Sequence, residues 1–138
     1  MANEALVQAV KEIASFARSG KSDEAYQRYE KLFGDPGFSS YKPDEQRQAL
    51  RLMILAKNAP GSPSPAMAAA HEAAATQLAK LVAAHGEPSD YEMLGLCHLA
   101  GGDEAEASEA FRAGLTIERQ RNPQSDLCGA LMKRVSLL

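Results

Sequence analysis

The chain has 138 residues, of which 45% are apolar and 24% charged, and its formal net charge is −3. This length supports one domain with a hydrophobic core, and the acidic balance argues against nucleic acid as the main partner, because phosphate binding needs a positive surface. No stretch approaches the ~20 consecutive apolar residues of a membrane span, and the N-terminus does not read as a signal peptide. We therefore expect a cytoplasmic protein without membrane contact, in which Cys97 and Cys128 are reduced and buried.

Two amphipathic helices are predicted at the N-terminus. Residues 3–19 carry apolar side chains at helical spacing, and Gly20 ends the first helix. Ser22 is expected to cap a second helix, which stops at the breaker Gly34-Asp35-Pro36-Gly37. The pattern predicts a helical hairpin.

The central stretch predicts two longer helices joined by a loop. Pro43 starts the first, which we expect to run to about Lys57. Its apolar residues are nearly continuous from Ala49 to Ala56, so we expect it to be the most buried element. A Pro- and Ser-rich loop over 58–65 precedes an alanine-rich helix that runs to about His85.

Three further helices are predicted before the C-terminus. Ser89 and Asp90 are candidate caps for the first, and a Gly-Gly-Asp break at 101–103 separates it from the second. The second ends near Asn122-Pro123, and Ser125 caps a last amphipathic helix that runs to Leu138. About seven helices are expected in all.

The segment from Tyr91 to Leu115 carries a recognisable spacing. Leu94-Gly95 follows an aromatic residue, and after the Gly-Gly-Asp break Ala107 precedes Phe111 by four positions. This order resembles a tetratricopeptide repeat, whose pattern is W-x2-L-G-x2-Y…A-x3-F…P, and the resemblance is clearest over residues 88–121. Arg119 stands where the family's closing proline would fall.

A second copy of the pattern lies at the N-terminus. Gly20 and Ala25 align with Gly102 and Ala107, at an offset of 82 residues (102 − 20). The resemblance implies an all-α single domain over 1–138, a right-handed stack of about three antiparallel helical hairpins with a capping helix. Its parts would be a degenerate repeat at 3–37, an elongated hairpin at 38–86, the best repeat at 88–122 and the cap at 124–138.

For function, the resemblance implies a non-catalytic module that binds another protein. In this family the first helix of each hairpin lines a groove for a peptide or an amphipathic helix. Carried over by position, the groove residues are Val7, Val10, Ala14, Ala17 and Arg18 in the first repeat, and Ser89, Glu92, Leu96, Leu99 and Ala100 in the best repeat. Glu92 and Leu96 stand where chaperone-binding members hold a carboxylate clamp, so an apolar ligand is expected instead. An adaptor or a small secretion-type chaperone fits this description.

Two alternatives compete with an open groove. The same apolar residues could be buried beneath the N-terminal helix or the C-terminal cap. The chain could also be a structural subunit that forms a homodimer through its alanine-rich or terminal helix faces.

Catalysis is not indicated by the sequence. It contains no GxSxG elbow, no phosphate-binding loop and no metal-ligand spacing such as HExxH. We expect His98, at the family's aromatic position, to be a core residue, and His71 and His85 to lie on the surface. No cofactor or metal is predicted.

Overall fold

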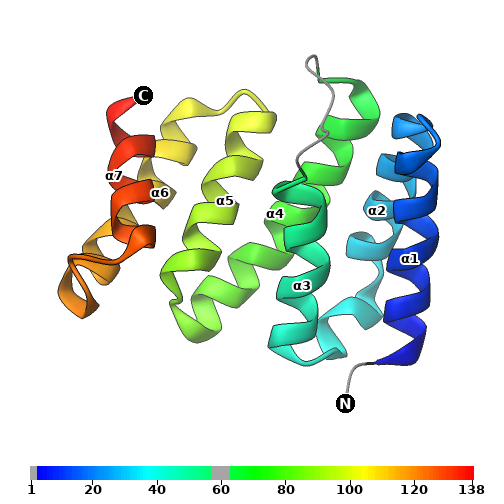
Figure 1. Cartoon of the computed structure of the whole chain (residues 1–138), viewed down its shortest axis with the longest axis horizontal. Helices are drawn as coiled ribbons and strands as arrows, with labels where there is room; N and C mark the ends of the chain where they lie inside the picture. Colours follow the sequence, from blue (N-terminus) through cyan, green and yellow to red (C-terminus); the bar gives the residue numbers. More distant parts are fainter. Residues whose placement is uncertain (1–2, 57–62) are drawn as a thin grey trace. The chain divides into compact units, whose positions relative to one another are not determined.

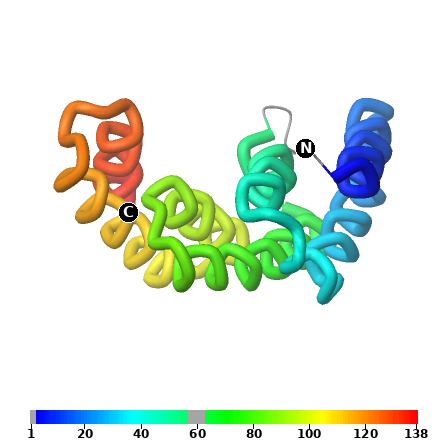
Figure 2. Tube along the Cα trace, turned by 90° about the horizontal axis from the view of Figure 1, so that it is seen from below, coloured from blue at the N-terminus to red at the C-terminus, as the bar shows by residue number. Residues whose placement is uncertain are grey.

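A computed structural model describes residues 3–56 and 63–138 (Figures 1 and 2). Within these ranges the chain forms seven α-helices and one short 3-10 helix, with no strand. The prediction of an all-α fold with about seven helices is confirmed. The chain divides into two compact units, Met1–Ala74 and Ala75–Leu138, and the division falls inside the fourth α-helix.

The first unit contains α1 (Glu4–Arg18), α2 (Ser22–Gly34), η1 (Pro36–Ser40), α3 (Pro43–Ile54) and the N-terminal half of α4 (Pro65–His85). Asn3 caps α1, because its side-chain oxygen accepts a hydrogen bond of 3.1 Å from the backbone N–H of Leu6. Lys21, and not Ser22, occupies the N-cap of α2, so the cap predicted there is wrong by one residue. The predicted loop over 58–65 lies mostly outside the described residues.

A row of aromatic rings forms the core of this unit. Phe33 stacks on Tyr29 at a centroid distance of 5.6 Å, and Phe38 meets Phe33 edge-on at 5.2 Å. Phe38 belongs to η1, which turns this ring back under the end of α2. One turn before Tyr29 on α2, the ring centroid of Tyr26 lies 6.0 Å from that of His71 in α4, so α2 packs against that helix.

The second unit contains the C-terminal half of α4, followed by α5 (Pro88–Ala100), α6 (Glu104–Arg121) and α7 (Asp126–Ser136). Pro88 is the first residue of α5, so Ser89 and Asp90 lie within its first turn and are not its caps. Ser125 does cap α7, accepting a hydrogen bond of 2.9 Å from the backbone N–H of Cys128. The core of this unit joins side chains of α6 and α7: Ala107, Phe111, Leu115, Cys128 and Leu131.

The turns of the two hairpins are alike in detail. Gly20 has φ 79° and Gly102 has φ 80°, in the left-handed region where glycine is preferred. The residue after each glycine donates its N–H back to the carbonyl five positions earlier: Lys21 to Phe16 at 3.0 Å, and Asp103 to His98 at 2.9 Å. Both helices therefore end in the same C-capping motif, 82 residues apart.

The correspondence extends beyond the turn. Adding 82 to the bounds of α3 gives 125–136. Helix α7 begins one residue later, at Asp126, and ends at the same residue, Ser136. Buried Gln46 and Ala49 of α3 correspond in this register to buried Cys128 and Leu131 of α7. Moreover, α1 and α3 run in the same direction within their unit, as α5 and α7 do within theirs (Figure 1). The α1–α2–α3 and α5–α6–α7 segments thus share the same turn geometry, helix order and helix directions.

The expectation that the third helix is the most buried element is wrong. α3 ends at Ile54, and the predicted terminus at Lys57 lies outside the described residues. Leu50 and Met53 are buried, but Leu52 and Leu55 are 56% and 41% exposed. A helix that is apolar nearly all round needs neighbours on every side, and this face of α3 has none covering it in the described chain.

Candidate functional site

A groove of about 210 Å³ lies between α1 and α3 in the first unit. Its lining is mainly apolar. The residues that line it are Asn3, Leu6, Val7, Val10, Lys11, Glu45, Gln48, Ala49 and Leu52. Asn3 is the N-cap of α1, and the others lie in α1 or α3.

Glu45 closes one end of this groove. One of its carboxylate oxygens accepts the backbone N–H of Lys42 at 3.2 Å, at the start of α3. The other accepts the backbone N–H of Asn3, at the start of α1. A carboxylate at two helix N-termini complements both dipoles, so this side chain holds the two helix starts together.

The apolar surface continues along α3. A second hollow of about 500 Å³ is lined by Gln48, Arg51, Leu52, Leu55 and Ala56. It shares Gln48 and Leu52 with the α1–α3 groove, so the two hollows adjoin at Leu52. The exposed leucines of α3 therefore extend the groove and are not isolated surface residues.

Two cations lie beside this apolar surface, Lys11 on α1 and Arg51 on α3. Neither forms an ion pair with the part of the chain that the structure describes. Other cations in the same unit do: Arg28 pairs with Glu12 at 3.2 Å, and Arg47 with Asp44 at 3.1 Å.

The predicted groove residues of the first repeat divide into two groups. Val7 and Val10 line the groove. Ala14 is half-buried and Arg18 is exposed, and neither is among the lining residues. The sequence interpretation also missed the whole α3 wall, although the excess of apolar residues in that helix was the signal for it.

The predicted groove residues of the second unit are engaged with their own unit. Arg134 of α7 donates from its Nε to a carboxylate oxygen of Glu92 at 2.8 Å. Leu96 and Leu99 pack against the core cluster of α6 and α7. Both leucines are half-buried, so the C-terminal part of the chain covers this face in part, and the groove at Leu96 and Leu99 stays a prediction.

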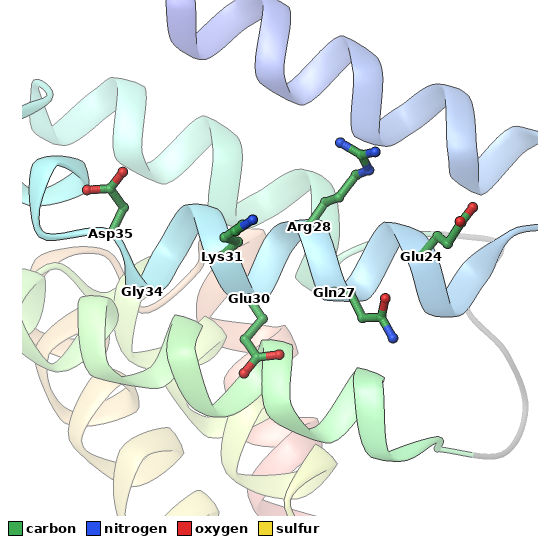
Figure 3. Close-up of a pocket in the computed structure, with 7 residues that line it drawn as sticks. All are labelled: Glu24, Gln27, Arg28, Glu30, Lys31, Gly34 and Asp35. Atoms are coloured by element: carbon green, nitrogen blue, oxygen red, sulfur yellow. The ribbon is translucent and has the colours of Figure 1, made fainter.

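A larger hollow of about 790 Å³ runs along α2 and is lined by Glu24, Gln27, Arg28, Glu30, Lys31, Gly34 and Asp35 (Figure 3). Its side chains do not converge on one point, since Arg28 and Glu30 project to different sides of the helix in Figure 3. Arg28 is also held elsewhere, with its guanidinium 4.3 Å from the centre of the Phe16 ring and paired with Glu12. This surface is a solvated, mixed-charge helix face.

The predictions for the three histidines hold only in part. His71 is buried, not on the surface, and its Nδ1 lies 2.8 Å from the carbonyl oxygen of Met67. Burial lowers the pKa of His71. His98 is half-buried, whereas His85 is exposed as expected.

Both cysteines are buried free thiols, as predicted. Burial raises the pKa of Cys97 to about 12, which makes it a poor nucleophile at neutral pH. Within residues 3–56 and 63–138, no group of three or more His, Cys, Asp or Glu side chains is placed to hold a metal ion.

None of the helices in the described ranges combines the length and the apolar character needed to cross a membrane. Comparisons of the sequence and of the structure with known proteins gave no matching family model, no matching curated protein and no matching solved structure.

Proposed function

We propose that this chain is a non-catalytic protein-interaction module, built from hairpins similar to tetratricopeptide repeats, that binds a segment of a partner protein in the α1–α3 groove. The observation that carries the proposal is the exposed Leu52, which stands beside an open groove walled by Val7 and Val10. Such a module would serve as an adaptor or as a small secretion-type chaperone.

The energetics favour an occupant. Fully burying a leucine side chain is worth about 1.5–3 kcal/mol, so covering the exposed halves of Leu52 and Leu55 contributes about 1 kcal/mol each. The valines of α1 add further apolar area in the same place. A ligand that fills the groove therefore gains free energy from surface that the isolated chain leaves in water.

Selection of peptides against the groove tests the proposal. A displayed library of random peptides of about 16 residues, long enough for four helical turns, is panned on the wild-type chain. Enriched peptides are expected to lose binding to Leu52→Asp. They should keep binding to Leu137→Asp, a matched control at a residue that is 75% exposed on α7's C-terminal side. Enriched peptides that bind Leu52→Asp as well as the wild type would place the site elsewhere.

Self-association is a second candidate, favoured by exposed apolar residues at the end of the second unit. Met132, Leu137 and Leu138 are all exposed on or just after α7. A structural subunit could pair two copies through this face. Sedimentation equilibrium at two concentrations would show a dimer that Met132→Asp dissociates, whereas a monomer at both concentrations would exclude this role.

A further inference from the structure

We infer that the occupant of the α1–α3 groove is an acidic amphipathic helix of a partner protein, which inserts an aliphatic side chain between Val10 and Leu52. The inference rests on the proposed function and deepens it by naming the chemistry of the ligand. Three observations support it: the counterpart of the groove in the second unit, the charges at its rim, and the kind of backbone that forms its walls.

In the second unit, the position that corresponds to the space between Val10 and Leu52 is closed by the chain's own side chains. In the 82-residue register, Val10 corresponds to Glu92 and Leu52 to Arg134. Glu92 and Arg134 form the 2.8 Å ion pair between α5 and α7, with side chains only 13% and 33% exposed. The counterpart pair in the first unit has no charge to join α1 to α3, and both of its members line an open groove.

The aliphatic pair Val10 and Leu52 favours a different ligand group from the one that a charged pair would favour. Water or a polar side chain placed between Val10 and Leu52 would find no hydrogen-bond partner on either of them. A branched aliphatic side chain would contact both and release water from both. The position therefore accepts an apolar anchor from outside the first unit.

The rim of the groove favours negative charge on the ligand. Lys11 and Arg51 flank the apolar surface and form no ion pair with the described residues. Glu45, the carboxylate of the lining, already accepts two backbone N–H groups, which complement its charge. Acidic residues beside the apolar anchor would approach the two cations, which raises the association rate and fixes the orientation of the ligand.

The walls of the groove favour a helical ligand. Both walls are α-helices, whose backbone groups are bonded within the helix. No strand edge is available in the described chain to pair with an extended peptide. An amphipathic helix satisfies its own backbone hydrogen bonds without help from the groove walls, and it presents anchors at positions i, i+3 or i+4, and i+7.

The test uses three fluorescent peptides of about 16 residues that share one leucine face and carry Glu, Gln or Lys on its flanks. Anisotropy titrations are carried out at low and high salt. We expect the Glu peptide to bind the wild type about tenfold more tightly than the Gln peptide and the Lys peptide to bind most weakly, with the differences shrinking at high salt. The double variant Val10→Glu/Leu52→Arg introduces the ion pair of the second unit into the groove. It should lower the affinity for the Glu peptide at least tenfold.

A charge reversal keeps the test informative if the transplanted pair disturbs folding. Lys11→Glu/Arg51→Glu changes two exposed side chains and should reverse the order, with the Lys peptide binding most tightly. Arg119→Glu/Lys133→Glu makes the same change in net charge at exposed positions of the second unit and should leave the order unchanged. Lys133 is the matched control for Arg51, because it lies 82 residues later in the chain.

The outcomes separate the inference from the proposed function. If all three peptides bind equally and the transplanted pair abolishes binding, the groove is a binding site but the acidic ligand is wrong. If none of the helical peptides binds while library peptides still depend on Leu52, the helical ligand is wrong and the proposed function stands. If neither kind of peptide depends on Leu52, both fail.

Discussion

Replacement of Gly95 by alanine probes the packing of α5 against α6 in the second unit. A Cβ atom at this position would lie 2.4 Å from Cε1 and 2.6 Å from Cδ1 of Phe111, well inside van der Waals contact. The Phe111 ring is fully buried and cannot swing into solvent. Overpacking of this kind costs about 1–3 kcal/mol. The gain of about 1 kcal/mol in helix propensity from Gly to Ala offsets part of that cost, so we expect a net loss of up to about 2 kcal/mol.

Gly129 is a matched control in the same unit. It lies within α7, and a Cβ atom there would meet nothing within 4 Å. Gly129→Ala should therefore raise the free energy of unfolding by up to about 1 kcal/mol. Urea unfolding followed by far-UV circular dichroism compares both variants with the wild type. A Gly95→Ala variant as stable as Gly129→Ala would show that α5 and α6 do not approach each other as the structure has them.

The remaining predictions concern the first unit. Leu50→Ala should cost about 2–5 kcal/mol because its side chain is fully buried, whereas Leu52→Ala should stay within about 0.5 kcal/mol; equal losses would mean that Leu52 is covered. Gly20→Ala should cost about 1–2 kcal/mol at φ 79°, and a thermal melt that does not shift would contradict the left-handed turn. Because the pKa of His71 is lower in the folded chain than in the unfolded chain, the imidazole of the unfolded chain becomes protonated at a higher pH. Stability should therefore fall as the pH drops below about 6.5. That slope should weaken in His71→Gln between about pH 7 and 5, and an unchanged slope would assign the acid sensitivity to other groups.

The features that the sequence predicted correctly depend on a few residues that lie close together in the chain. Gly20 and Gly102 end their helices in the left-handed conformation, and Ser125 caps α7 through its own side chain. Gly95 and Phe111 belong to the predicted repeat spacing, and a Cβ atom at Gly95 would lie only 2.4 Å from the Phe111 ring. Such features are local, or follow from a spacing of small and large residues along one helix pair.

The features that the sequence did not predict concern which helix faces find neighbours. The pattern of α3 showed too many apolar residues for one face, but it could not show that Leu50 is covered and Leu52 is not. His71 was expected at the surface, yet it is buried, and its ring centroid lies 6.0 Å from that of Tyr26 in α2. Leu96 was assigned to the groove by its position in the repeat pattern, and in the structure it is half-buried against the core cluster of α6 and α7. Each outcome depends on a partner far away in the sequence.

The divergence between the two three-helix segments bears on why the α1–α3 groove is open. The Glu92–Arg134 pair is partly exposed, and pairs of this kind contribute little to stability, with a median of about 0–1 kcal/mol. Its absence between α1 and α3 therefore costs the first unit little in folding free energy. Keeping Leu52 at 56% exposure does have a cost, because it leaves a large apolar side chain in water beside two valines. The position between Val10 and Leu52 lacks an ion pair that would contribute little to stability, and it leaves apolar surface exposed to water. Access for a ligand, as proposed above, explains this combination better than the stability of the fold does.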